Sequence, residues 1–381
     1  MEEAARNAMD AVDFLVIGAG ISGASAAYEL AAVGSVCLIE AEAQPGYHST
    51  GRSAALYTAN FGSPLVRKIN AAGYGFFFTP PDGFTDLPLV SPRGALTLAK
   101  PGQEAALAAL VAQSSPDHPI VPLSRDAALA KAPLMRPERF TAAAYEVGVL
   151  DMDVDALHQA YLRGVKRRGG ALQCSAPVTA LRRDGDGWIV MAGGVAVRAR
   201  VVINAAGAWG DAVGALAGAA PQGLVPKRRT AMTVDAPPGL AVESLPLVEY
   251  VGEGPYLKPE AGALMASLGD ETPVAPQDVQ PEELDIALTA EWLETHTQVS
   301  VKRAPRAWAG LRSFVSDGDP VAGFDPTVPG FFWLIGQGGY GIMMAPTLAR
   351  ITAALAAGQP MPADLAARGI TVAALRPGRS G

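Results

Sequence analysis

The residues best suited to chemistry begin with a set of glycines near the start of the chain. Three glycines with GxGxxG spacing follow an apolar run and open an Ala-rich segment: Gly18, Gly20 and Gly23. A strand, a tight turn and a helix in this order let a pyrophosphate reach the unpaired N–H groups at the helix N-terminus. Glu40 ends the next apolar run, where a carboxylate can bind ribose hydroxyls. The pattern predicts an adenine dinucleotide site and disfavours NADP, whose 2′-phosphate would meet Glu40, but it does not choose between NAD and FAD.

Three further segments could complete such a site. Small residues, hydroxyls and an arginine fill the loop after the acid: His48, Ser49, Thr50, Arg52, Ser53, Ala54 and Ala55. This loop can donate hydrogen bonds to phosphate and pack against a flat ring system, although an ordinary surface loop is the alternative. The apolar run 201–205 ends in small residues that leave room at its tip. The glycine-rich turn 336–341 also follows an apolar run, but no acid follows it at the expected distance, so it is not predicted to be a second dinucleotide site.

The elements that must position these segments form an α/β fold. Residues 12–17, 22–33 and 36–39 read as strand, helix and strand, a unit that builds parallel sheets covered by helices. Further helices are expected near residues 103–113, 154–168 and 282–296, and further strands near residues 171–174, 188–191, 200–205 and 331–335. This pattern predicts that the chain crosses twice between two domains. We expect a dinucleotide-binding domain of residues 12–59, 150–221 and 307–358, an inserted domain of residues 60–149 and 222–306, and terminal segments 1–11 and 359–381.

Composition narrows the possible partners. The net charge of −7 and pI near 5.2 argue against nucleic acid. Cys37 and Cys174 are the two cysteines, both expected in strands, so a reducing compartment and a cytoplasmic location are the simplest expectations. Glycines and a proline interrupt the uncharged stretch 326–349, which predicts strand, turn and helix there rather than a transmembrane segment. The four histidines lack metal-ligand spacing, so no metal site is expected.

Motifs along nearly the whole chain resemble the D-amino-acid oxidase family of flavoenzymes, and within it the bacterial D-arginine dehydrogenases. They are GAGISG, AQPGYHSTGRSA, DVDALHQAYLRG, INAAGAW, PKRR, YLKP, WAGLRSFVSDGDPVAG and GQGGYG. The resemblance implies non-covalent FAD, held by a Rossmann-like domain, and an inserted α+β substrate domain whose mainly antiparallel sheet covers the flavin. It implies FAD contacts from Gly18, Gly20, Ile21, Ser22, Gly23, Glu40, Ala41, His48, Ser49, Thr50, Arg52, Ser53, Ala54, Ala55, Val178, Ala206, Gly207, Trp209, Gly338, Gly339, Tyr340, Gly341 and Ile342.

The resemblance also implies roles in substrate binding. Arg229 of PKRR, Arg312 of GLRSF and Tyr256 of YLKP match positions that bind the substrate carboxylate. The carbonyl of Gly339 matches an acceptor for the substrate amine. An arginine fork meets a carboxylate bidentately, although a structural ion pair is the alternative for each arginine. The implied reaction is oxidative deamination of a D-amino acid to an imino acid, which hydrolyses to a 2-keto acid and ammonia. Oxygen, a quinone and another carrier all remain open as the electron acceptor.

The chain departs from D-arginine dehydrogenases where the substrate side chain would bind. Leu56 and Phe61 replace a His and a Tyr, and Ala95 replaces a Glu that holds the guanidinium. Because burying an unpaired cation is costly, D-Arg and D-Lys are expected to be poor substrates, and small or apolar side chains are favoured. Oxidation of a secondary amine or a 2-hydroxy acid, an NAD-dependent dehydrogenase, and a flavin-holding subunit without a substrate are the alternatives.

Overall fold

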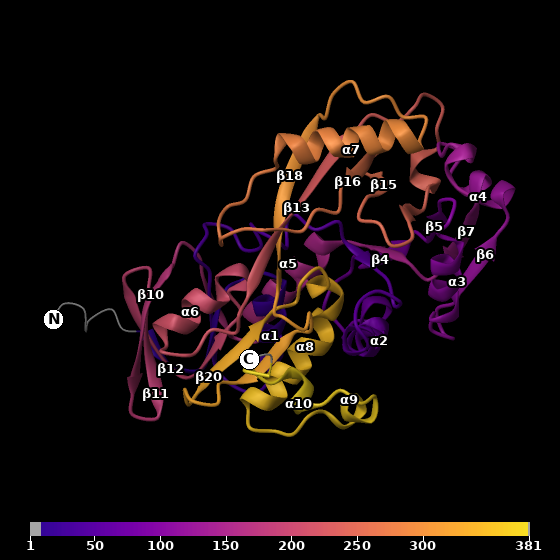
Figure 1. The fold of residues 1–381 in the computed structure, drawn as a ribbon. Helices are drawn as coiled ribbons and strands as arrows, with labels where there is room; N and C mark the ends of the chain where they lie inside the picture. Colours follow the sequence, from indigo (N-terminus) through magenta and orange to yellow (C-terminus); the bar gives the residue numbers. More distant parts are fainter. Residues whose placement is uncertain (1–8, 380–381) are drawn as a thin grey trace.

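The computed structural model of the protein describes residues 9–379. Within them one eight-stranded sheet forms the first layer (Figure 1). Its strands are β1 (Met9–Ile17), β2 (Val36–Ile39), β9 (Ala171–Gln173), β10 (Val178–Asp184), β11 (Gly187–Ala192), β12 (Val195–Asn204), β19 (Val321–Phe324) and β20 (Phe331–Ile335). Five strands run parallel in the order β20-β12-β1-β2-β9, and β10, β11 and β19 join them as antiparallel strands. The predicted parallel sheet is therefore confirmed.

Alternate residues of β1 enter separate apolar clusters on the two faces of this sheet. Phe14 and Val16 pack with the helices α1 (Ile21–Leu30), α5 (Val154–Arg167) and α8 (Gly341–Ala356). Leu15 and Ile17 pack with the β10–β11 hairpin and α6 (Gly210–Leu216). Because side chains of a strand alternate between faces, an apolar run of this kind has to be covered on both sides. The helix expected at residues 154–168 is also confirmed, with the Asp153 side chain accepting a hydrogen bond from the Ala156 N–H.

A nine-stranded, mainly antiparallel sheet forms the second layer within the described residues. Its strands are β5 (Ala95–Ala99), β6 (Ile120–Leu123), β7 (Ala142–Glu146), β13 (Val225–Val234), β14 (Leu247–Tyr250), β15 (Tyr256–Glu260), β16 (Ala263–Ser267), β17 (Thr272–Pro273) and β18 (Arg306–Phe314). They lie in the order β17-β13-β16-β15-β14-β5-β7-β6, with β18 on β13. Helix α7 (Glu283–His296) covers one face of this sheet (Figure 1). This layer is the antiparallel sheet expected from the family resemblance.

Smaller elements connect the two layers. A three-stranded sheet has the order β3-β8-β4. Of the remaining helices, α2 packs against α8, and α3 and α4 pack against strands of the nine-stranded sheet. These elements are β3 (Leu56–Tyr57), β4 (Val90–Pro92), β8 (Leu150–Met152), α2 (Pro64–Phe78), α3 (Glu104–Ala112), α4 (Arg125–Lys131), α9 (Ala363–Ala367) and α10 (Val372–Leu375), with single 3-10 turns at Pro137–Arg139, Gly207–Trp209 and Val242–Ser244. The core contains Leu365 and Leu375, so the last segment packs on the fold instead of leaving it.

Some expected boundaries differ from the observed ones. Strand β1 begins at Met9, so residues 9–11 belong to the sheet, while residues 1–8 of the expected leader lie outside the described residues. Cys174 lies one residue beyond β9 and is only partly buried, whereas Cys37 is buried in β2. The expected domain boundary at residue 307 falls inside β18, because this strand pairs along its whole length with β13.

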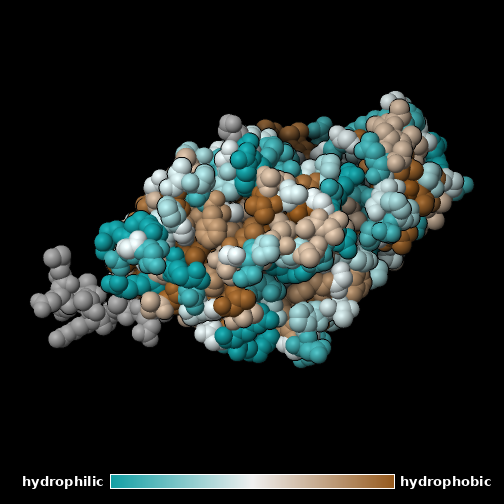
Figure 2. All heavy atoms as spheres, turned by 90° about the horizontal axis from the view of Figure 1, so that it is seen from below, coloured by the Kyte–Doolittle hydropathy of each residue, from teal (hydrophilic) through white to brown (hydrophobic). Residues whose placement is uncertain are grey.

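The outer surface mixes polar and apolar residues. On the face shown in Figure 2, hydrophobic residues form small separate patches between hydrophilic ones. Stretch 326–349 forms β20, a glycine turn and the start of α8, as predicted. Among the described residues no helix has both the length and the apolar character needed to cross a membrane.

Candidate active site

A cavity of about 1000 Å³ brings the predicted functional residues together. The glycine motifs, the loop 47–55 and the tip of β12 line one part of it, and the nine-stranded sheet lines another. Every residue predicted to bind cofactor or substrate contributes to this lining except Gly23. Gly23 lies beneath the turn, where a Cβ atom would come within 1.8 Å of the Gly18 carbonyl oxygen. Its part in the site is therefore to permit close packing of turn and helix.

The first glycine turn leaves the start of α1 open to a ligand. Gly18 has a φ of +98°, a conformation that favours glycine, and the N-cap residue Gly20 has no side chain to cover the start of the helix. The Ile21 N–H donates to Thr50 Oγ1 at 3.0 Å, which ties the turn to the loop 47–55. Glu40 Oε2 accepts from the Ala19 N–H at 2.7 Å, so the carboxylate is fixed at the tip of β2 beside the turn. These two hydrogen bonds from the turn fix Glu40, which is expected to bind ribose, and Thr50, which positions the loop 47–55.

The two glycine motifs meet at a polar contact. Ser22 Oγ donates to Gln337 Oε1 at 2.6 Å, which joins the N-terminal turn of α1 to the turn before α8. Gln337 lines the cavity, and its buried Nε2 has no hydrogen-bond partner among the described residues. A buried donor without an acceptor is costly, so a ligand with an acceptor atom fits here. The phosphate and ribityl oxygens of FAD supply such acceptors between two helix N-termini.

The loop 47–55 is held by contacts to the second layer. Ser49 Oγ donates to the Leu311 carbonyl at 2.6 Å. His48 Nε2 lies 2.9 Å from Glu42 Oε1, and the His48 ring lies 4.6 Å from that of Trp209. The Arg52 guanidinium binds Asp278 at 2.5 Å and the carbonyls of residues 279 and 309 at 3.1 Å. Protein oxygens therefore accept the hydrogen bonds of the Arg52 guanidinium. This geometry does not favour the expected hydrogen bond from Arg52 to a phosphate.

The middle cation of the PKRR motif points away from the other two because β13 is a strand: Lys227 and Arg229 both contact Glu271, and Arg228 does not. Arg228 lies under α7 and pairs with Asp285 and Glu282 at 3.0 and 2.7 Å. Arg229, on the opposite face, lines the cavity. It donates from Nε to the Asp270 carbonyl at 2.8 Å, and its Nη2 lies 3.3 Å from Glu271 Oε1. Arg228 is therefore a structural arginine, whereas Arg229 faces the space available to a ligand, because side chains alternate between the faces of a strand.

Strand β18 brings the second arginine to the same place. Arg312 lies opposite Lys227 on the neighbouring strand β13. Arg229 is two residues further along β13, opposite Gly310, so both arginines line the cavity on the same sheet face. Its nearest charged partner among the described residues is Glu271, at 3.7 Å. Burial, and after it the neighbouring charge of Arg229, lower the pKa of Arg312. Glu271 is half-exposed and also binds Lys227 at 2.8 Å, so three cations share this carboxylate. The excess of positive charge suits an anionic group.

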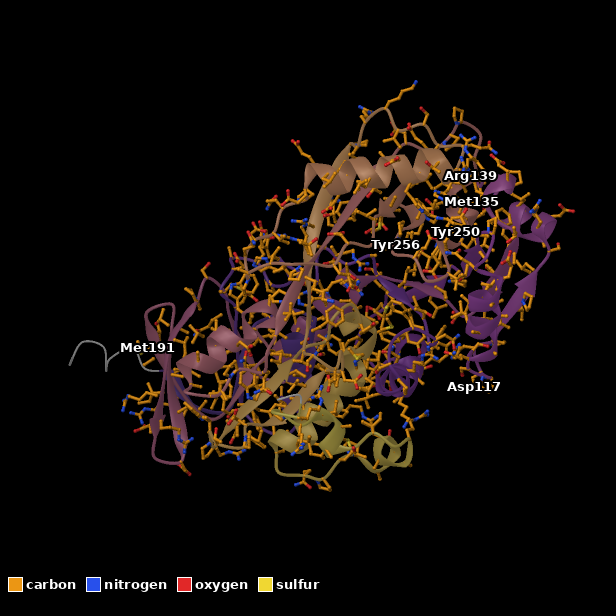
Figure 3. All side chains as sticks on the ribbon, viewed as in Figure 1. Asp117, Met135, Arg139, Met191, Tyr250 and Tyr256 are labelled. Carbon is orange, nitrogen blue, oxygen red and sulfur yellow. The ribbon has the colours of Figure 1, made fainter. Side chains whose placement is uncertain are left out.

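The second glycine turn packs directly against Arg312. The Gly338 N–H donates to the Ser313 carbonyl at 2.9 Å, which fixes the turn on β18. At Gly339 a Cβ atom would lie 1.7 Å from Arg312 Nη2, so only glycine leaves room for the guanidinium. Tyr256, on β15, lines the same cavity and lies, in the view of Figure 3, between the α7 layer above and helices α2 and α8 below.

Phe61 and Tyr340 lie together beside this site. Their ring centroids are 5.2 Å apart, and Phe61 is 49% exposed, so this aromatic pair lies where the cavity meets solvent. Leu56 and Ala95 line the cavity further inside. These positions give part of the cavity an apolar wall.

Several acidic residues in the lining were not predicted, and two of them have a raised pKa. Glu146 of β7 is buried and accepts from Asn60 Nδ2 at 2.8 Å, and Glu249 of β14 accepts from Thr97 Oγ1 at 3.3 Å. Burial raises the pKa of Glu146 to about 7, with the nearby Glu249 adding to the shift, and burial also raises the pKa of Glu249. A charged residue within each short apolar strand is the sequence signal that could have identified them.

Comparison with known proteins identifies the family of the chain. The model of the DAO family, FAD dependent oxidoreductase, matches residues 13–355. Mitochondrial dimethylglycine dehydrogenase of Mus musculus is 30% identical over 135 residues, which are 35% of this chain and 16% of that longer protein.

Solved structures show the same fold over nearly the full length. Glycine oxidase from Geobacillus kaustophilus has a TM-score of 0.81 at 22% identity, covering 96% of this chain and 99% of that one. FAD-bound L-α-glycerophosphate oxidase from Mycoplasma pneumoniae has a TM-score of 0.83 at 18% identity, covering 91% and 95%. The chain therefore belongs to the DAO family of FAD-dependent oxidoreductases, and FAD is its cofactor.

Proposed function

We propose that the protein oxidises the Cα–N bond of an amino acid, with the D-enantiomer as substrate. The observation that carries this proposal is the pair Arg229 and Arg312, which share one carboxylate partner in a cavity continuous with the FAD-binding motifs. A guanidinium fork binds a carboxylate in one orientation, so two of them fix the substrate's plane. The D configuration follows from the family resemblance of the sequence motifs.

Each residue has a defined part in this proposal. Arg229 and Arg312 bind the substrate carboxylate, and the Tyr256 hydroxyl donates a hydrogen bond to it. The Gly339 carbonyl accepts a hydrogen bond from the substrate amine, next to the Arg312 guanidinium. Holding the carboxylate and the amine at once orients the Cα–H bond, and such positioning is a large part of catalysis by cofactor enzymes. Leu56, Phe61 and Ala95 give apolar contact for the carbon atoms of the substrate side chain.

The reaction balances as a two-electron oxidation. The amine enters as the neutral base, and its lone pair forms the C=N bond as the Cα–H bond breaks. FAD, when bound, accepts the hydride with its electron pair. The imino acid then takes up water and releases ammonia, leaving a 2-keto acid. The flavin passes its electrons to an acceptor that the cavity geometry leaves open.

A second candidate is oxidation of a substituted amine or of a 2-hydroxy acid. The names of two relatives favour considering it, since one acts on dimethylglycine and the other on glycerophosphate. Such substrates keep an anionic group for the arginines and a C–H bond beside nitrogen or oxygen.

Product analysis tests the proposal. The FAD-loaded protein is incubated with an artificial electron acceptor and with D-alanine, L-alanine, N-methyl-D-alanine or D-lactate. We expect pyruvate and ammonia in equal amounts from D-alanine. Pyruvate with methylamine from the N-methyl compound alone, or pyruvate from lactate alone, would instead support the second candidate.

A further inference from the structure

The cavity carries opposite charges at separate places along one sheet. Arg229 and Arg312 lie on β13 and β18, whereas Glu249 and Glu146 lie on β14 and β7. Strands β16 and β15 separate β13 from β14 in the sheet order. A ligand that spans the cavity therefore meets cations at one end and carboxyl groups at the other.

The strand register explains why both acids face the cavity. Glu249 lies opposite Thr97 in the β14–β5 pair, and Glu146 lies opposite Ala95 in the β5–β7 pair. Residues 95 and 97 are two apart on the same strand, so their side chains share one face. All four residues line the cavity. The acids thus lie on the two strands that flank β5, offset by two residues along it, and both line the cavity.

Within the described residues neither acid forms an ion pair, although Arg67 lies near enough to Glu146 to lower its pKa slightly against the larger effect of burial. Glu146 is 6% exposed, and its contacts are Asn60 at 2.8 Å and the Thr58 hydroxyl at 3.5 Å. Glu249 accepts one hydrogen bond, from Thr97. Nearby Glu253 differs, because it pairs with Lys100 at 2.8 Å. Glu146 is buried and Glu249 is half-buried. A carboxyl group in such a place either keeps its proton or binds a cation, so the Glu146–Glu249 pair offers a site for a cation from outside the chain.

The surrounding residues hold Glu146 in place rather than neutralise it. Asn60 Nδ2 also donates to the His118 carbonyl at 2.8 Å, and its Oδ1 accepts from the Ser115 N–H at 2.7 Å. The amide is thereby locked with one N–H on the carboxylate. Leu247 lies opposite Ala95 and gives an apolar surface beside the acids, which suits a methylene chain.

We infer that the Glu146–Glu249 pair binds a distal ammonium or guanidinium group, so the preferred substrate is an amino acid with a basic side chain. The inference rests on the proposed function and deepens it. It replaces the expectation of a small or apolar side chain, which was based on Ala95 without its cross-strand neighbour Glu146. The apolar wall then contacts the methylenes of the side chain, while the carboxyl pair binds its tip.

Binding of a compound that cannot be oxidised at Cα tests the inference directly. Heptanoate and 6-aminohexanoate have the same number of non-hydrogen atoms and the same carboxylate, but one ends in a methyl group and the other in an ammonium. Kd is measured from the change in flavin absorbance of the FAD-loaded protein. We expect 6-aminohexanoate to bind about tenfold or more tightly than heptanoate, as for a charge-assisted hydrogen bond in a desolvated site. Equal binding, or tighter binding of heptanoate, overturns the inference.

Single substitutions test whether Glu146 and Glu249 cause the preference for 6-aminohexanoate over heptanoate. Glu146→Gln and Glu249→Gln should each reduce the preference for 6-aminohexanoate by about tenfold and leave the Kd of heptanoate nearly unchanged. Glu253→Gln is the matched control, since it removes a carboxylate already paired with Lys100, and should keep the preference. Flavin retention shows that each variant is folded. A preference that survives in both of the first two variants would contradict the assignment to these residues.

Kinetics separate this inference from the proposed function. The ratio of kcat/KM for D-lysine to that for D-norleucine should be well above one and should fall in Glu146→Gln. If D-norleucine is oxidised as well as D-lysine, the inference fails and the proposed function stands. If no amino acid is oxidised but 6-aminohexanoate still binds preferentially, the cation site stands and the proposed function fails.

Discussion

At the scale of single residues, Arg312 has the most demanding position in the site. It is largely buried, packs on Gly339 and shares Glu271 with Arg229. Such a guanidinium contributes through its fixed fork geometry, which a lysine cannot reproduce.

Replacing this arginine should separate substrate binding from cofactor binding. We expect Arg312→Lys to lower kcat/KM for amino acids by about 10²- to 10³-fold, because two charge-assisted hydrogen bonds to the carboxylate are lost. Flavin content should stay unchanged. Arg306→Lys, at the exposed end of the same strand, is the control and should keep full activity. Steady-state kinetics of both variants measure the difference, and equal activity of the two would argue against carboxylate binding by Arg312.

Glu146 gives a prediction about stability and pH. Because its pKa is raised to about 7, the folded protein keeps this proton where the unfolded chain has already lost it. The free energy of unfolding therefore falls as pH rises from about 4.5 to about 7, by up to about 3 kcal/mol. Glu146→Gln should remove this loss, so that it is more stable than the native protein at pH 8 and similar to it at pH 5. Urea unfolding at both pH values measures the effect, and a variant less stable at pH 8 would refute it.

At the scale of elements, the close approach of the turn before α8 to β18 determines where the arginine fork lies. A methyl group at Gly339 would collide with the Arg312 guanidinium. Gly339→Ala should therefore raise KM by at least about tenfold while FAD remains bound, since a small displacement of a positioning group has a large effect. Gly75→Ala in α2 makes the same change where nothing lies within 4 Å, and it should be neutral or slightly stabilising. Michaelis constants of the two variants provide the comparison, and an unchanged KM in Gly339→Ala would contradict this placement.

The elements also show which features could be predicted from sequence. The strand–helix–strand start, α5 and the segment β20–α8 have strong local patterns, and all three are confirmed. The pairing of β5 with β7 and β14 joins segments that are far apart in the chain. No local pattern specifies such a pairing, because it depends on long-range packing. Glu146 and Glu249 were missed for this reason, and Ala95 was read without the acid opposite it.

At the scale of the whole molecule, each of the two sheets supplies a different part of the site. The eight-stranded sheet presents the helix N-termini of α1 and α8 and the carboxylate of Glu40, which suit FAD. The nine-stranded sheet presents the arginines and the carboxyl pair, which suit a substrate. The reacting bond must lie between the layers, where the cavity connects them.

The pH dependence of turnover belongs to this scale, since it concerns the whole site. Hydride leaves only from the neutral amine, and of the histidines His48 lines the cavity but is engaged with Glu42. We expect kcat/KM for D-alanine, which has no side-chain cation, to rise with pH between about pH 6 and pH 10. A flat profile over this range would count against amine oxidation.

The central claim is that an amino acid held by the two arginines reduces the flavin. The most direct test is anaerobic mixing of the FAD-loaded protein with D- and L-amino acids while the visible flavin absorbance is followed. We expect bleaching by D-amino acids, fastest with D-lysine or D-arginine, and bleaching about 10²- to 10³-fold slower in Arg312→Lys at the same low concentration. Failure of every amino acid of either configuration to bleach the flavin would contradict it.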